Sequence, residues 1–142
     1  MVKDADSIDV VLPKFMEFID GCAVVAHNAA FDTGFIKKNC NDLGLEFTST
    51  IVDTVPLARF LYPDLKRVKL NLVAKYLGVS LENHHRAVDD AKATAEIFLI
   101  SIKKMIEELN INNINELNKE FNSYLKTKGL DQKYIVTIEE VK

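Results

Sequence analysis

The chain has 142 residues, 48% hydrophobic and 27% charged, with a formal net charge of −3. These values predict one globular domain that buries roughly 70% of its unfolded surface, and they exclude a disordered or fibrous segment. A weakly acidic chain does not hold nucleic acid by a global positive field, so any such contact must be local. No apolar run of about 18 residues and no leader-like start is present, so we expect a cytoplasmic protein.

The sequence contains only two cysteines, Cys22 and Cys40. Two cysteines cannot form a disulfide framework and favour a reducing compartment. A zinc site built from these cysteines and the histidines would need C-x2-C or H-x3-H spacing, which the sequence lacks.

The first predicted elements are a helix and a short strand. Apolar residues at helical spacing predict a helix that begins at Ser7 or Asp9 and ends near Gly21. Residues 22–26 then form a continuous apolar run, which favours a strand buried on both faces.

The same alternation continues after this strand. A second helix carries Asp32 in its first turns and has Gly44 as its C-terminal signal. Residues 50–53 read as a second strand, and Asp53 or Thr54 can cap a third helix that stops at residues 62–63.

The second half of the chain is predicted to be mainly helical. Asn71 is expected to cap a short helix over residues 72–77, which Gly78 closes. A long helix then begins after His85 and runs to about Leu109. Its predicted buried stripe consists of Ala91, Ala95, Phe98, Ile102 and Ile106.

Beyond Leu109 the composition shifts toward asparagine, and we divide the chain there into residues 1–109 and an Asn-rich helical tail, residues 110–142. The tail keeps helical spacing of its apolar residues, which predicts a solvated amphipathic helix ended by Gly129. Residues 134–138 alternate weakly and are predicted to form a terminal strand.

Five cations in the middle of the chain are the best local candidate for contacts with nucleic acid. The alternative is that they lie on solvated helix faces and a loop, which is the usual place of a charge run. These residues are Arg59, Lys66, Arg67, Lys69 and Lys75.

Three polar clusters interrupt the apolar pattern, at residues 27–32, 52–54 and 85–90. A carboxylate in the first turns of a helix that follows a buried strand lies near the carboxyl end of the sheet, where open α/β folds bind ligands. Asp32 fits this description, and His85 and Asp90 could serve one cleft. The alternative for any such aspartate is a capping or helix-dipole role.

Paired carboxylates near a histidine are suited to phosphodiester chemistry. Magnesium takes oxygen ligands, and a two-metal site stabilises both the attacking and the leaving oxygen. Such a site needs about four carboxylates and a base with a pKa near neutrality, which histidine supplies.

Two segments resemble a known family. The sequences HNAAFD at residues 27–32 and HRAVDD at residues 85–90 resemble the second and third motifs of the DEDDh family of 3′-to-5′ exonucleases, which have an RNase H-like fold. The sequences IVDT at 51–54 and LARFLYP at 57–63 are most similar to the proofreading exonuclease domains of PolC-type DNA polymerase III. The resemblance covers about residues 1–109.

The resemblance implies roles for five residues. Asp32 and Asp90 correspond to ligands of Mg²⁺ or Mn²⁺, and His85 corresponds to the general base. Asn28 and Phe31 correspond to positions near the nucleotide, with helix capping and core packing as their alternative roles. The implied partners are a DNA 3′ end and the polymerase domains of a longer chain.

The remaining polar residues of the motifs have structural interpretations. We expect Asp53 to cap the helix that follows it. His27 and His84 are expected to be structural or to face solvent.

The sequence departs from the family at one motif. The family begins with a strand bearing Asp-x-Glu, and no such element precedes Asp32, so half of the metal ligands are missing. Asp4, Asp6 and Asp9 fall too late in the family pattern to replace them. We therefore expect a truncated α/β RNase H-like fold, with short parallel strands flanked by helices and a helical tail.

The same departure leaves the strand at residues 22–26 without its family partner. An exposed apolar edge invites pairing with another chain. We expect that the chain self-associates or that residues 134–138 cover an edge.

Two main functional hypotheses follow. The first is a metal-dependent 3′-to-5′ DNA exonuclease domain of a replicative polymerase. The second is a catalytically inactive structural or interaction fragment, which the missing Asp-x-Glu favours. A helical adaptor would leave Asp32, His85 and Asp90 unexplained.

Overall fold

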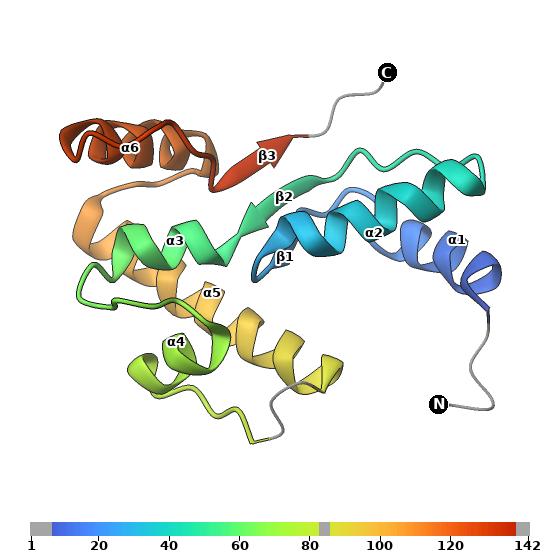
Figure 1. Ribbon diagram of the computed structural model, residues 1–142, viewed down its shortest axis with the longest axis horizontal. Coiled ribbons are helices and arrows are strands. Elements are labelled where there is room, and N and C mark those ends of the chain that lie inside the picture. Colours follow the sequence, from blue (N-terminus) through green and yellow to red (C-terminus); the bar gives the residue numbers. More distant parts are fainter. Residues whose placement is uncertain (1–6, 83–85, 139–142) are drawn as a thin grey trace.

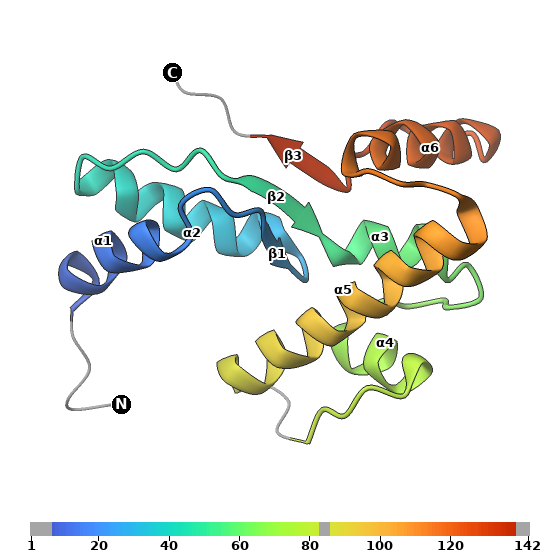
Figure 2. The ribbon, with the colours of Figure 1, turned by 180° about the vertical axis from the view of Figure 1, so that it is seen from behind.

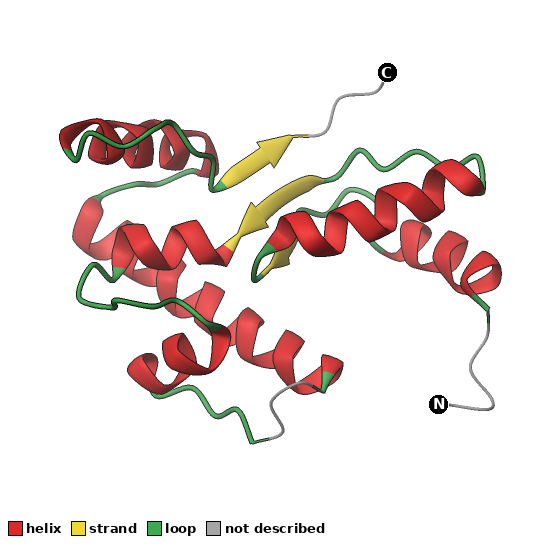
Figure 3. Ribbon diagram, viewed as in Figure 1, coloured by secondary structure: helices red, strands yellow, loops and turns green. Residues whose placement is uncertain are grey.

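The computed structural model describes residues 7–82 and 86–138 of the chain (Figure 1). In this part of the chain, two helices alternate with two short strands, and four further helices and a final strand follow (Figure 3). The elements are α1 (Ile8–Phe18), β1 (Val24–Ala26), α2 (Ala29–Asp42), β2 (Thr50–Asp53), α3 (Thr54–Leu61), α4 (Leu70–Leu77), α5 (Ala87–Leu109), α6 (Ile114–Thr127) and β3 (Val136–Ile138).

The described strands form a mixed sheet in the order β1-β2-β3. β1 and β2 are parallel, with Val25 opposite Val52, whereas β3 is antiparallel to β2, with Val136 also opposite Val52. This arrangement confirms the α/β class, the short strands flanked by helices and a strand near the C-terminal end. β3 covers the edge of β2, not the edge of β1.

Helices cover both faces of this sheet. Ile51 and Val52 are adjacent in β2, so their side chains point to opposite faces. Ile51 packs with α1 and α2, whereas Val52 packs with α3 to α6. Figures 1 and 2 accordingly show α1 and α2 together at one end of the molecule and α3 to α6 at the other.

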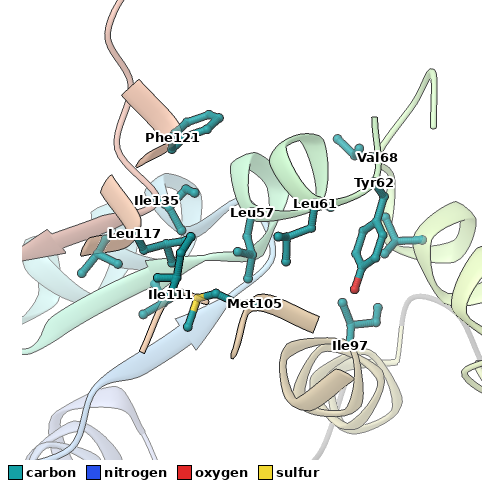
Figure 4. Close-up of a cluster of buried hydrophobic side chains, with 14 of the residues drawn as sticks. Leu57, Leu61, Tyr62, Val68, Ile97, Met105, Ile111, Leu117, Phe121 and Ile135 are labelled. Carbon is teal, nitrogen blue, oxygen red and sulfur yellow. The ribbon is translucent and has the colours of Figure 1, made fainter. Parts of the chain in front are cut away.

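The buried apolar side chains form one cluster on each face of the sheet. The larger cluster joins α3, α4, α5, α6 and β3 (Figure 4). Leu57 and Leu61 of α3 meet Ile97 and Met105 of α5, and all four are nearly inaccessible to solvent. Phe121 of α6 is equally buried and lies with its ring centroid 5.6 Å from that of Phe60. The apolar face of the tail helix is therefore part of the main core.

Three local predictions were wrong. β1 is half-buried and not buried on both faces, because its outer edge has no partner strand among the described residues. α4 begins at Leu70 after Lys69, so Asn71 lies inside the helix and does not cap it. The buried stripe of α5 consists of Ala93, Thr94, Ile97, Ser101 and Met105, so positions 94, 97, 101 and 105 are buried one residue before the predicted 95, 98, 102 and 106.

The shifted stripe has a physical cause. The predicted residues Ala91, Ala95 and Ile106 are exposed, although they have helical spacing of their own. When a helix is apolar on two sides, the spacing of its apolar residues does not determine which side is buried. The packing of α3 and α4 against α5 selects the face that carries Ile97.

The outer edge of β3 is closed by one side chain of α6. Oδ1 of Asn118 accepts hydrogen bonds from the backbone N–H groups of Ile135 (2.8 Å) and Val136 (2.9 Å). Its Nδ2 donates to the carbonyl of Val136 at 2.6 Å. The amide therefore pairs with β3 as a neighbouring strand would, and it leaves β1 as the edge of the sheet that is open to pairing in the described chain.

No helix in the described ranges has the length and apolar character needed to cross a membrane. Cys22 is exposed and Cys40 is buried, and both are free thiols.

Candidate nuclease site

The carboxyl ends of the parallel strands β1 and β2 lie side by side, and Asp53 is the residue that joins them. Oδ1 of Asp53 accepts a hydrogen bond from Val55 N–H at 2.9 Å, which caps α3 as expected. The same oxygen accepts from Asn28 N–H at 3.0 Å, and Oδ2 accepts from Ala29 N–H at 3.1 Å. One carboxylate therefore holds the beginnings of both α2 and α3.

Asn28 makes the sharp turn between β1 and α2. Its φ of 66° lies in the left-handed region, which asparagine tolerates better than most residues. Its side chain makes no capping hydrogen bond, so the helix entry depends on the backbone turn and on Asp53.

Asp32 lies in the first turn of α2, directly after this turn. Its side chain is exposed, yet partial burial of the carboxyl raises its pKa, and the negative charge of Asp53 raises it further. The neighbouring Phe31 is 79% exposed. α2 therefore presents a carboxylate and an aromatic ring to solvent at the carboxyl end of the sheet.

His27 connects the end of β1 to two other segments. Its Nε2 lies 2.6 Å from the carbonyl oxygen of Val68, and because a carbonyl only accepts, this nitrogen carries a hydrogen. Nδ1 lies 2.8 Å from the Thr54 hydroxyl, which donates to it when the ring is neutral. Burial lowers the pKa of His27, although the Val68 hydrogen bond and the charge of Asp53 oppose this effect. The expected structural role of His27 is confirmed.

The hydrogen bond to Val68 fixes the basic loop, defined as Lys66, Arg67, Val68 and Lys69, at this end of the sheet. Val68 is buried in the larger core, while the three cations beside it are exposed. Positive charge is thus held next to the end of β1. The other two cations of the predicted group, Arg59 and Lys75, are exposed on α3 and α4.

Asp90 lies in the first turn of α5 and is partly buried. Its backbone N–H donates to the Arg86 carbonyl at 2.9 Å, and its own carbonyl accepts from the Thr94 hydroxyl at 2.8 Å. α5 also contacts β1. His84 and the predicted base His85 lie outside the described residues.

Of the predicted site residues, the structure describes Asn28, Phe31, Asp32 and Asp90. His27, Asn28 and Asp32 surround the end of β1, and Asp53 connects them to β2. The charge that acts on Asp32 is that of Asp53, one strand away. Within residues 7–82 and 86–138, no group of three or more His, Cys, Asp or Glu side chains gathers to hold a metal ion.

The sequence interpretation missed the second role of Asp53. Capping of α3 was predicted from the strand-to-helix junction, but the hydrogen bonds to Asn28 and Ala29 join residues 24 to 25 positions apart. The signal that could have found them is the presence of polar residues at the ends of two consecutive parallel strands, because such ends are neighbours in space.

Comparisons with known proteins agree with this architecture. The exonuclease family model matches residues 1–98. The chain is 59% identical over 138 residues to the PolC-type DNA polymerase III of Clostridium perfringens, which covers 97% of this chain and 10% of that protein. It is 49% identical over 142 residues to the PolC-type DNA polymerase III of Caldanaerobacter subterraneus, with the same coverage. The PolC-type enzyme of Listeria welshimeri is 48% identical over 119 residues, or 83% of this chain and 8% of the enzyme.

The chain therefore spans about a tenth of the length of these relatives. The family match includes α1 to α4, both parallel strands, the basic loop and the first turns of α5 with Asp90. Because the match covers well over half of its residues, the chain belongs to the exonuclease family.

Proposed function

We propose that this chain is part of a metal-dependent 3′-to-5′ exonuclease that removes nucleotides from DNA ends for a replicative polymerase in the cytoplasm. The observation that carries the proposal is the position of the basic loop. His27 holds the loop at the end of β1, next to the helix that presents Asp32. Cations beside a carboxylate site neutralise the phosphates of an approaching strand.

The side chains around Asp32 have distinct tasks in this proposal. Asp32 and Asp90 would hold the metal ion, which activates the attacking water when bound, and His85 would accept a proton from that water. Lys66, Arg67 and Lys69 contact the strand. Asn28 and Phe31 lie near the terminal nucleotide, where the exposed Phe31 ring offers a flat apolar surface to a base.

The described residues supply only part of a metal centre. A hard divalent ion takes about six oxygen ligands, and two of them would come from Asp32 and Asp90. In the described chain, no group of three or more His, Cys, Asp or Glu side chains gathers to hold such an ion. The residues of this chain alone therefore do not fit a complete two-metal site, and activity requires carboxylates from another segment.

Two apolar surfaces support the proposal that such a segment docks here. β1 has an outer edge without a partner strand in the described residues. On α5, Val88 is 80% and Leu99 is 66% exposed, although both are large apolar side chains. A strand added to β1, from a longer polypeptide or from a second copy, would cover an open edge and bring carboxylates toward Asp32.

The second candidate function is an inactive structural or interaction fragment of the same family. The absence of Asp-x-Glu from the sequence and the lack of a described three-ligand group favour it. Loss of two carboxylates from a site whose members act together is expected to remove most of the rate enhancement.

A direct test measures the loss of 3′-terminal nucleotides from 5′-labelled single-stranded DNA with Mg²⁺ or Mn²⁺. The controls are a chelator and the Asp90→Ala variant, purified in parallel to exclude a contaminating nuclease. Shortening from the 3′ end that both controls abolish supports the exonuclease and implies assembly of the missing ligands. A folded sample without cleavage contradicts it for this chain and favours the inactive fragment.

A further inference from the structure

We propose that a pocket beside β3 binds the phosphate backbone of single-stranded nucleic acid, with Tyr134 as a stacking surface for one base. This inference rests on the proposed function, because it assigns a second contact to the same substrate strand. The pocket is separate from the basic loop, since none of the loop residues lines it.

The pocket exists because α2 presents small side chains where it leaves the sheet. Ala29, Ala30 and Thr33 of α2 line it, together with Ile51 and Thr137 of the sheet. The cavity measures about 480 Å³. This volume lies within the usual range for ligand sites of roughly 300–1,000 Å³.

Positive side chains from three different segments line this cavity. Lys37 comes from α2, Arg59 from α3 and Lys133 from the segment that leads into β3. Asp53 is the one acidic residue among the described residues of the lining, and its two oxygens accept hydrogen bonds from three backbone N–H groups. Among the described lining residues, Arg59 and Lys133 already outnumber the single carboxylate, which favours an anionic ligand.

Tyr134 also lines the pocket and is 57% exposed. An exposed ring next to cations is the combination that single-strand binding proteins use, since bases stack on the ring while cations track the backbone. A free phosphate ion would contact only the cations and would have no base to stack on the Tyr134 ring.

The segment that carries Lys133 and Tyr134 is held in place by α6. Lys133 N–H donates to Oδ1 of Asn122 at 3.0 Å, and Ile135 N–H donates to Asn118 at 2.8 Å. The two pocket side chains therefore project from a fixed backbone, which lowers the entropy that binding must remove.

The pocket also shares its wall with the candidate nuclease site. Thr33 lines the pocket, and Asp32 precedes it in the first turns of α2. A strand whose end lies at Asp32 can therefore extend along α2 toward Arg59 and Lys133. In this inference the Asn-rich tail helps to hold the substrate, because Asn118 and Asn122 of α6 bind the backbone of the segment that carries Lys133 and Tyr134.

The test is fluorescence anisotropy of a labelled oligothymidylate with the 142-residue chain, in chelator so that no cleavage occurs. The pocket variant is R59Q/K133Q, and the matched control is K103Q/K119Q, which removes two exposed cations from α5 and α6. Each contact between a cation and a single-strand phosphate contributes about 0.7 to the slope of log affinity against log salt. We expect the pocket variant to lower the slope by about 1.4 and the control to leave it unchanged.

Tyr134→Leu provides an independent reading of the stacking contact. We expect affinity for the oligonucleotide to fall at least about fivefold, with unchanged affinity for inorganic phosphate. Circular dichroism of each variant verifies the fold. The contrary outcome is that Tyr134→Leu changes neither the affinity for inorganic phosphate nor the affinity for the oligonucleotide. The site would then be a simple phosphate site, and the proposal is overturned.

Two further outcomes also overturn the inference. The first is that the wild-type chain does not bind the oligonucleotide. The second is that the pocket variant and the control variant weaken binding equally. Cleavage data separate this result from the proposed function. Binding through the pocket without nuclease activity leaves the inference standing and removes the exonuclease, whereas cleavage with unaltered binding of R59Q/K133Q removes only the inference.

Discussion

Asp53 and Asn28 are 25 residues apart, and the Asp53 carboxylate accepts a hydrogen bond from the Asn28 backbone N–H at 3.0 Å. Because the same carboxylate caps α3, one side chain fixes the angle between the two helices that leave the sheet. The position of Asp32 therefore depends on a residue in the neighbouring strand.

Asp53→Ala is expected to destabilise the chain by about 2–3 kcal/mol, because it removes an N-cap and leaves two further N–H groups without their acceptor. Asp53→Asn keeps one acceptor oxygen and should cost less. The measurement is urea denaturation. The control is Asp131→Ala, an exposed loop carboxylate expected to change stability by less than about 0.5 kcal/mol. Equal effects of the two alanine variants would contradict the bridging role.

His27 should make stability depend on pH. Burial holds its folded-state pKa below the unfolded value, so the unfolded chain takes up the proton first as the pH falls. The contribution of His27 is therefore complete above the ordinary histidine pKa of about 6.5 and decreases as the pH falls from there toward the folded-state pKa.

The measurement compares urea midpoints at several pH values for wild type and His27→Asn. His84 and His85 are present in both proteins, so the difference between the two curves reports His27. We expect the wild-type midpoint to fall more steeply below neutrality. Parallel curves would show that the His27 ring has the same pKa in the folded and unfolded chain.

The two faces of α5 should respond differently to truncation. Ile97→Ala removes a buried side chain packed between α3 and α5 and should cost about 2–5 kcal/mol. Leu99→Ala, two residues away and 66% exposed, should change stability by less than about 1 kcal/mol. Thermal or urea unfolding measures both. A large loss from Leu99→Ala would mean that this face is already covered in solution, as self-association would cause.

Asn118→Ala should release β3 from α6. The substitution removes the partner of two backbone N–H groups and one carbonyl, at a cost of about 2–3 kcal/mol. We expect faster hydrogen exchange at Ile135 and Val136. Asn115→Ala, an exposed position on the same helix, is the control. Unchanged exchange in Asn118→Ala would show that pairing with β2 alone holds the strand.

Much of the local structure followed from the sequence. β2 was predicted at its observed bounds, and α3 ends at Leu61, directly before the predicted stop at residues 62–63. These predictions succeed because turn and capping residues act within a few positions. β1 is two residues shorter than predicted, and α4 begins earlier. These differences lie at element ends, where tertiary contacts compete with local preference.

The motifs at residues 27–32 and 85–90 identified the exonuclease family without any knowledge of the fold, and the match over residues 1–98 confirms it. The roles of Asp32, Asp90 and His85 stay predictions. The sequence could not show that Asp53 reaches Asn28 or that His27 holds the basic loop, since these hydrogen bonds join residues 25 to 41 positions apart.

The sequence by itself therefore determined the order of the elements, the α/β class and the family, because these depend on periodicity, capping and short motifs. Only the tertiary structure decided which face of α5 is buried, which edge of the sheet is open and how Asn118 secures β3. The physical reason is that a helix with two apolar faces and a strand with two edges each have alternatives of similar local energy. Packing between distant segments selects among them.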